Sequence, residues 1–216
     1  MKLINSSIMK KTYIAIILCI IPATSLFAHP HVFIKNSSEF VFKENKLDGV
    51  WETWEFDRVF SADIISWLDV NQDGDFSADE SIQVYNNAFI NLQHYYYYTF
   101  IRQGNERTNP ASVTKFRSHA KDGIMTYTFY IDLSSYTGNN IYFAVYDYTY
   151  FCDIEYKEPI TLTYDETVVQ PTYEIVENKN YPVYYNPVGA ATDTTIYYKP
   201  GPGLYTYYPK EIHLTW

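Results

Sequence analysis

Alternating apolar and polar positions dominate the chain from residue 32 onward and predict a mainly β structure. Residues 32–42 and 47–56 form two such runs on either side of a short polar turn, which is the pattern of a β-hairpin. The most regular alternation covers residues 125–133 and predicts a strand with one buried face. Further strands are expected at residues 97–102, 113–118, 141–146, 160–164, 173–176 and 212–216.

Helical spacing replaces the alternation between the first hairpin and the later strands. Asp57 has the character of a helix N-cap, and the apolar positions of residues 59–68 follow it at helical intervals. A second helix is expected to begin near Ala78 and to end at residues 94–96. The predicted fold class is therefore α+β: a mainly antiparallel sheet or sandwich with an EF-hand-like helix–loop–helix inserted at about residues 58–95.

The first 28 residues predict an export signal. Lys10 and Lys11 precede an apolar run at residues 13–21, and small and polar residues follow as far as Ala28. We expect cleavage after Ala28, which leaves residues 29–216 as a single periplasmic domain with a Tyr-rich, less regular part at about residues 165–216. No later segment is apolar for long enough to span a bilayer, so we expect no direct membrane insertion.

Composition and charge narrow the classes of function. Hydrophobic residues make up 47% of the chain and charged residues 19%, which argues against a disordered or coiled-coil protein. Residues 1–28 hold three lysines and no acid, so their removal takes the formal charge from −9 to −12. A surface this acidic argues against nucleic acid as a partner and is compatible with metal ions. Only Cys152 remains after cleavage, so we expect it to be a small buried residue without an intramolecular disulfide.

The acidic segment at residues 69–80 matches a calcium-binding EF-hand loop throughout. Its oxygen-bearing positions have the spacing that brings the six to eight hard oxygens preferred by calcium to one point. Gly74 occupies the sixth place, where the chain must turn sharply. The expected calcium ligands are the side chains of Asp69, Asn71, Asp73 and Glu80, the backbone carbonyl of Asp75, and the ninth-place oxygen of Ser77. The alternative is an acidic surface loop that keeps its shape without the ion.

Two histidines stand at the expected new N-terminus. The α-amine and the imidazoles of His29 and His31 would place two or three nitrogen donors within three residues, which suits zinc, nickel or copper. Pro30 has no amide N–H and so prevents chelation through successive backbone amides. An acidic ligand would then come from a strand or helix end, with Asp57 and Asp147 as weaker candidates. The alternative is a solvated N-terminal tail.

Several short motifs, taken in this order, resemble one known family. They lie at residues 29–33 (His-Pro-His-Val-Phe), 54–57 (Trp-Glu-Phe-Asp), 60–61 (Phe-Ser), 69–80 and 144–147 (Ala-Val-Tyr-Asp), followed by Tyr150. The chain resembles, over about residues 29–165, an uncharacterised bacterial family described as the periplasmic component of an ABC-type transport system. Some of its members are implicated in zinc uptake beside an inner-membrane permease of the nickel/cobalt type. The resemblance implies an accessory role in transition-metal transport.

These observations leave two functions from different classes open. The first is a periplasmic metal-binding accessory that supports zinc or nickel/cobalt uptake through an inner-membrane permease and carries a structural calcium site. The second is a calcium-stabilised envelope interaction module with no transition-metal role. We expect no enzymatic activity, because the sequence holds no nucleophile motif, no zinc-protease helix motif and no paired carboxylates with a matching base.

Overall fold

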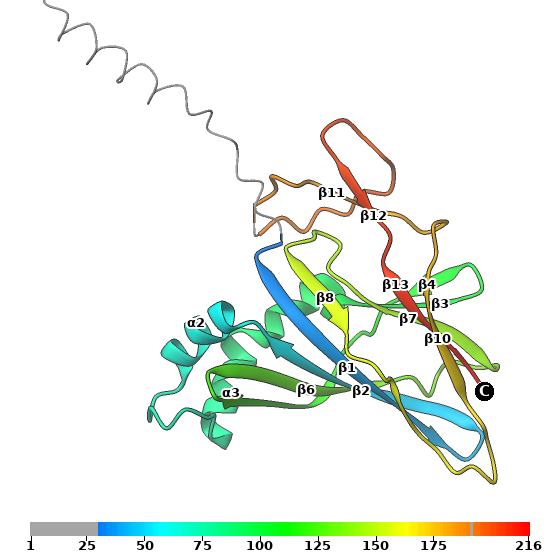
Figure 1. The fold of residues 1–216 in the computed structure, drawn as a ribbon, viewed down its shortest axis with the longest axis horizontal. Coiled ribbons are helices and arrows are strands. Elements are labelled where there is room, and N and C mark those ends of the chain that lie inside the picture. The colour runs from blue at the N-terminus through cyan, green and yellow to red at the C-terminus, as the bar shows by residue number, and fades with distance from the viewer. Residues whose placement is uncertain (1–29, 191) are drawn as a thin grey trace, which may run out of the picture.

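Two β-sheets face each other, and a helical layer covers one end of the first sheet (Figure 1). The structure, a computed structural model, describes residues 30–190 and 192–216. The predicted signal peptide at residues 1–28 and the predicted ligand His29 lie outside the described residues.

The first sheet is built on the predicted hairpin. Its strands run in the order β5-β6-β2-β1-β8, and β9 also pairs with β1. The members are β1 (Val32–Lys43), β2 (Lys46–Phe56), β5 (Thr114–Lys121), β6 (Ile124–Asp132), β8 (Cys152–Tyr156) and β9 (Thr161–Thr163). Every second side chain of β1 and β2 is buried, so the alternation in the sequence did identify the inward face.

Strand β1 also has parallel neighbours, so the first sheet is mixed within the mainly antiparallel architecture that was predicted. Val32 pairs with Cys152 at the start of β8, and Phe40 pairs with Leu162 of β9. We did not predict β8, because it is short and carries two acidic residues among its five positions. The fold class α+β is confirmed, with a mixed first sheet.

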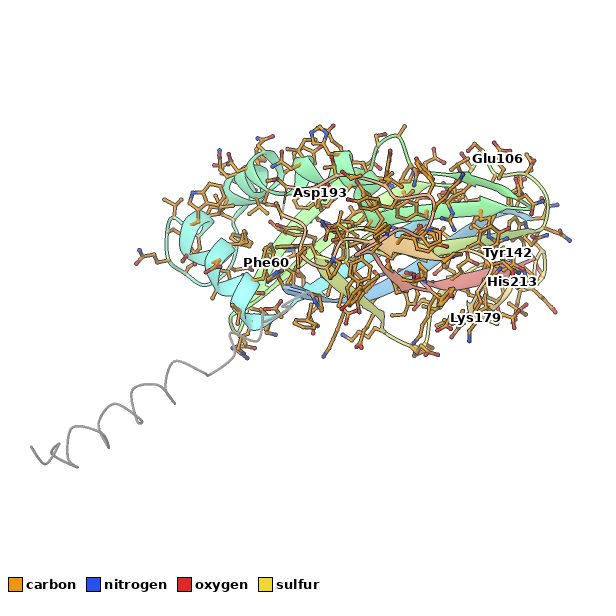
Figure 2. The ribbon with its side chains drawn as sticks, turned by 90° about the horizontal axis from the view of Figure 1, so that it is seen from above. Phe60, Glu106, Tyr142, Lys179, Asp193 and His213 are labelled. Atoms are coloured by element: carbon orange, nitrogen blue, oxygen red, sulfur yellow. The ribbon has the colours of Figure 1, made fainter. Side chains whose placement is uncertain are left out.

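The second sheet has five strands in the order β10-β13-β7-β3-β4, all antiparallel. Its members are β3 (Thr99–Gln103), β4 (Glu106–Thr108), β7 (Asn140–Val145), β10 (Thr172–Glu177) and β13 (Lys210–Thr215). The Tyr-rich C-terminal part adds a small hairpin of β11 (Val183–Tyr185) and β12 (Tyr205–Tyr207). Figure 2 shows Tyr142 of β7 and His213 of β13 together on this sheet, far from Phe60 in the helical layer.

One hydrophobic core joins the two sheets and the helices. Phe40 of β1 meets Phe143 of β7 edge to face, with ring centroids 5.2 Å apart. Trp54 is fully buried and packs against Phe129 of β6. Cys152 is buried, as predicted.

A buried acid interrupts this apolar interior. Glu52 lies on the inward face of β2, opposite Ser38 of β1, and is fully buried. Ser38, Asn36 and Trp54 lie close to its carboxyl group, but within the described chain none makes a hydrogen bond of good geometry to either oxygen. Burial raises the pKa of Glu52 to about 8.

The helical layer contains α2 (Arg58–Leu68), α3 (Ala78–Asn87) and the 3₁₀ segment η1 (Phe89–Tyr98). Asp57 is the N-cap of α2, as predicted, because its side chain accepts hydrogen bonds from the N–H groups of Val59 and Phe60. The second α-helix ends earlier than expected, at Asn87, and continues only as the tighter η1. Within the part of the chain that the structure describes, no helix is long and apolar enough to cross a membrane.

Candidate metal centre

The acidic loop joins α2 to α3 and makes two tight left-handed turns. Gln72 has φ +59° and Gly74 has φ +87°. Glycine adopts the second value without steric cost, whereas a side chain there would be strained. The predicted sixth-place glycine is therefore the residue that this backbone requires.

Backbone N–H groups hold the oxygen-bearing side chains of the loop in position. Asn71 Oδ1 accepts from the N–H of Asp73 at 2.8 Å, and Asp73 Oδ1 accepts from the N–H of Asp75 at 3.0 Å. Asp69 Oδ2 accepts from the N–H of Gly74 at 3.0 Å. These bonds fix the side chains of Asp69, Asn71 and Asp73 against the backbone of the loop itself.

Glu80 closes the loop from the far end. One carboxylate oxygen accepts from the N–H groups of Val70 and Asn71, and the other accepts from the N–H and the hydroxyl of Ser77. The Ser77 side chain accepts in return from the N–H of Glu80, which makes a capping box at the start of α3. The Ser77 hydroxyl, followed by the surrounding N–H groups, lowers the pKa of Glu80 to about 2. Glu80 is thus a permanent anion covered by its own loop.

Asp69 has a buried carboxylate oxygen without a hydrogen-bond donor in the described part of the chain, and this oxygen bears on whether the loop can bind a cation. The residue is only 9% exposed, and no hydrogen-bond donor in the described residues reaches its Oδ1. Asp69 is also the C-cap of α2, where the helix dipole disfavours negative charge, and the last turn of α2 has no basic residue. A buried carboxylate oxygen left in this position fits a bound cation and fits the first ligand place of the predicted calcium loop.

The loop is fastened to the first sheet by three polar contacts. Asp75 Oδ1 accepts from the N–H of Ala120 in β5 at 2.7 Å, and that bond is the main reason why the pKa of Asp75 is lowered. The side chain of Ser81 in α3 bonds both the N–H and the hydroxyl of Ser118. The hydroxyl of Ser61, a fully buried residue of α2, accepts from the N–H of Met125 in β6. The sequence predicted only the backbone carbonyl of Asp75 as functional, because the pairing with β5 depends on tertiary structure.

The predicted transition-metal ligand His31 and the weaker candidates Asp57 and Asp147 lie on adjoining segments at one end of β1. His31 immediately precedes this strand; its N–H donates to the carbonyl of Phe151, and its ring lies 4.9 Å from the Phe151 ring. Asp57 Oδ2 accepts from the N–H of Phe33 at 2.9 Å. Burial alone would raise the pKa of Asp57, but the hydrogen bonds from the N–H groups of Phe33, Phe60 and Val59 keep it below its usual value.

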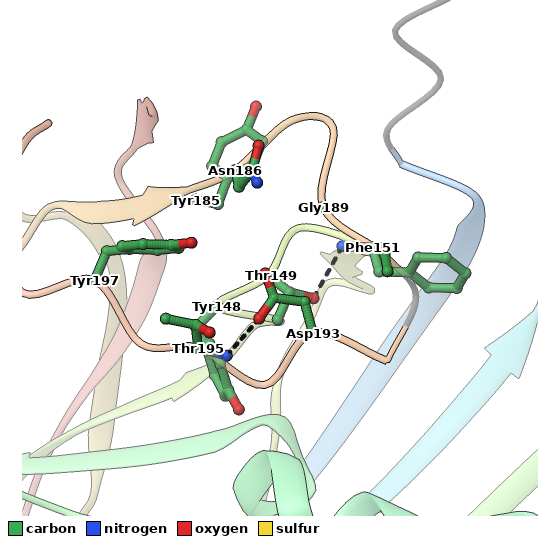
Figure 3. Close-up of a pocket in the computed structure, with 10 residues that line it drawn as sticks. Tyr148, Thr149, Phe151, Tyr185, Asn186, Gly189, Asp193, Thr195 and Tyr197 are labelled. Atoms are coloured by element: carbon green, nitrogen blue, oxygen red, sulfur yellow. Dashed lines mark hydrogen bonds between the residues drawn. The ribbon is translucent and has the colours of Figure 1, made fainter. Parts of the chain in front are cut away.

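Asp147 approaches the same end from the other side of the strand. Its carboxylate accepts from the N–H and hydroxyl of Thr149 and from the N–H of Cys152, the residue that pairs with Val32. Burial raises the pKa of Asp147 against these bonds. Figure 3 shows the adjoining loop, in which the N–H of Phe151 points to Thr149 Oγ1. His31, Asp57 and Asp147 are thus neighbours through their strands, while both aspartates already serve as acceptors.

No group of three or more His, Cys, Asp and Glu side chains gathers as a ready metal cage within residues 30–190 and 192–216. Asp69, Asp73 and Glu80, three of the predicted calcium ligands, are therefore not gathered around one point in this structure. The Glu80 carboxylate faces the N–H groups of Val70, Asn71 and Ser77.

Fold and loop together define an α+β architecture: two facing sheets with an acidic helix–loop–helix against one of them. The chain belongs to a family of proteins of unknown function (DUF1007), whose model matches residues 14–216. It is also 32% identical over 98 residues to the "Uncharacterized 15.5 kDa protein in trpE 3'region" of Spirochaeta aurantia. That match covers 44% of this chain and 70% of the relative. No solved structure matches the chain.

Proposed function

We propose that the loop at residues 69–80 binds calcium and that the ion fastens the helical layer of an exported protein. The observation that carries the proposal is the buried Asp69 Oδ1, which has no donor in the described residues and lies at the C-terminal end of a helix. Asp69, Asn71, Asp73, Ser77 and Glu80 would hold the ion together with the backbone carbonyl of Asp75. Calcium would draw these oxygens together around its positive charge, and the loop brings them close along the chain.

The contacts with the sheet favour a structural role over a sensory one. Calcium sensors pair two loops and expose an apolar groove when they bind the ion. Here strand β5 takes the place beside the loop, through Asp75 and Ala120, and Ser61 and Ser81 fix both helices to the sheet. Helices held in this way have little freedom to open, so we infer that calcium acts as a clip.

Calorimetry tests this proposal on the processed protein. Titration with calcium should give one binding event per chain, and Glu80→Ala should abolish it. Asp79→Ala is the matched control, because Asp79 is an exposed acid in the same helical turn and outside the predicted ligand set. Calcium binding that survives unchanged in Glu80→Ala would disprove the site.

A second function is supported by the position of His31, Asp57 and Asp147 on adjoining segments at one end of β1. We propose that the protein is a periplasmic accessory that binds zinc or nickel at His29 and His31 and supports uptake through an inner-membrane permease. The acidic mature charge of −12 favours a cationic cargo, and the family resemblance of the opening motif points the same way.

Elemental analysis of processed protein separates this function from a calcium-stabilised envelope module. Zinc or nickel should be retained by the wild-type protein and lost from a His29→Ala, His31→Ala double variant. His94→Ala is the control, because His94 is an exposed histidine elsewhere on the surface. Equal metal content in the double variant would reject the transition-metal role and favour the envelope module.

A further inference from the structure

An aromatic cavity of about 170 Å³ lies between the start of β1 and the helical layer. Its inner wall consists of fully or nearly fully buried residues, among them Trp54, Tyr98 and Tyr127. Its mouth is formed by half-buried residues of three separate segments: Phe60 of α2, Leu92 of η1 and Phe151 of the loop before β8. The cavity therefore opens to the surface and narrows into the core.

Two hydroxyl groups of the inner wall lack a strong hydrogen-bond partner among the described residues, and that of Tyr127 is covered by its neighbours, so a guest reaches it by a small shift of the ring. Tyr127 is only 2% exposed, and its hydroxyl has no hydrogen-bond partner in the described chain. Burial raises the pKa of Tyr127, so this hydroxyl stays protonated and can donate. The Tyr98 hydroxyl accepts only a weak bond, from the Cys152 thiol at 3.5 Å. Buried hydroxyls without good partners destabilise a core unless something binds them.

The backbone that supplies Tyr98 is strained. Tyr96, Tyr97 and Tyr98 have φ values of +56°, +49° and +52° in succession. Residues with side chains avoid this left-handed region, and a run of three is costly to stability. The run directs Tyr98 into the buried wall of the cavity, while Tyr95, just before it, stays half-buried among the lining residues. Strain of this kind concentrates at ligand sites.

We propose that this cavity binds a small uncharged aromatic molecule, a single ring with one hydrogen-bonding oxygen, such as a phenol. An apolar cavity of about 150 Å³ in another protein accepts benzene, so the volume here suits one ring with a small substituent. The wall of aromatic rings offers stacking and edge contacts. Asp147 also lines the cavity, and its carboxyl group disfavours an anionic ligand. The oxygens of Asp147 already accept hydrogen bonds from Thr149 and Cys152, so they do not need a cation as a partner. The oxygen of the guest would accept from Tyr127.

Calorimetry with p-cresol and toluene tests the proposal on the processed wild-type chain. Both molecules should bind at a single site, p-cresol more tightly. Tyr127→Phe should weaken p-cresol binding about fivefold and leave toluene unchanged, the effect of one hydrogen bond. Equal weakening of both ligands would reject the role of the Tyr127 hydroxyl, and binding of neither ligand to folded wild-type protein would reject the site.

Filling the cavity supplies the second arm of the experiment. Ala88 lines the cavity, and Ala88→Leu should weaken both ligands at least about tenfold by occupying their volume. Leu92→Phe, which fills the mouth of the cavity from η1, is used instead if the Ala88→Leu protein does not fold. Ala62→Leu is the matched control, since Ala62 is an exposed alanine of α2 outside the cavity. Unchanged affinity in a folded cavity-filling variant would overturn the proposal.

Discussion

Glu52 in the sandwich and Asp69 in the acidic loop each have a buried carboxylate oxygen that accepts no hydrogen bond of good geometry within the described residues. Glu52 is surrounded by the strands of the first sheet, whose N–H groups bond neighbouring strands. Asp69 is surrounded by loop backbone, and its other oxygen accepts from the N–H of Gly74. The same unsatisfied group therefore occurs in two different settings.

The two settings call for different remedies. Inside the sandwich the carboxyl group of Glu52 is neutralised by binding a proton. Burial raises the pKa of Glu52 to about 8, so the group is mainly neutral near pH 7. The loop carries further oxygen-bearing side chains, among them Asn71 and Asp73, and Asp69 itself caps the C-terminal end of α2. The proposed calcium ion would draw several of these oxygens together, whereas a proton satisfies one. The environment, and not the carboxylate itself, selects the partner.

The largest expected effect is a gain in stability from Glu52→Gln. The folded-state pKa of Glu52 lies above its ordinary value of 4.5, so the folded protein binds this proton more tightly than the unfolded chain does. Its contribution is fully present below pH 4.5 and is lost as the pH rises toward 8. Glu52→Gln should therefore raise the free energy of unfolding by about 3 kcal/mol at pH 7 and by little at pH 4.

Urea unfolding between pH 4 and pH 8 measures this difference. Glu55→Gln is the control on the same strand, because Glu55 points outward and pairs with Lys157 at 3.4 Å. That surface change should alter stability by less than about 1 kcal/mol at any pH. A Glu52→Gln protein that is less stable than wild type at pH 8 would show that the buried acid is ionised and paired.

Calcium removal should have the next largest effect. At calcium concentrations about 100-fold above the dissociation constant, the ion adds about 2–3 kcal/mol to the stability of the folded state. Chelation should remove this gain from the wild-type protein, and Asp69→Asn should show none to remove. Thermal unfolding with and without chelator is the measurement, with exposed Asp79→Asn as the control. A calcium response retained in Asp69→Asn would place the ion elsewhere.

The smallest expected effect concerns the attachment of the loop to β5. Asp75→Ala removes the acceptor for the N–H groups of Phe76 and Ala120 and should lower stability by about 1 kcal/mol. Hydrogen exchange at the Ala120 amide should accelerate, while the amide of Met125, held by Ser61, should keep its protection. Unchanged exchange at Ala120 would mean that the loop does not depend on this contact.

The local elements could be predicted because their signals are local. The N-cap Asp57, the first hairpin and the glycine of the loop each follow from a few adjacent residues. The parallel pairing of β8 with β1 joins residues more than a hundred positions apart, and no adjacent pattern encodes it. The end of α3 at Asn87 was also missed, since the apolar stripe continues into η1.

Part of the missed information was present in the pattern. Glu52 has the same phase in β2 as Val50, Trp54 and Phe56, so the alternation placed an acid on the inward face. The spacing of the loop residues predicts calcium ligands, and that site stays a prediction, whereas the bond from Ala120 to Asp75 has no signal in the sequence. The cavity could not be predicted at all, because its walls come from segments spread between β1 and β8.

Helix α2 has its C-terminal end at the acidic loop and Phe60, near its other end, at the mouth of the aromatic cavity. The chain that leaves the loop through α3 reaches the same cavity at Ala88. Two helical segments therefore connect the proposed calcium loop with the proposed ligand cavity. If the ion tightens the hold on the guest by some factor, thermodynamic reciprocity requires the guest to tighten the hold on the ion by the same factor.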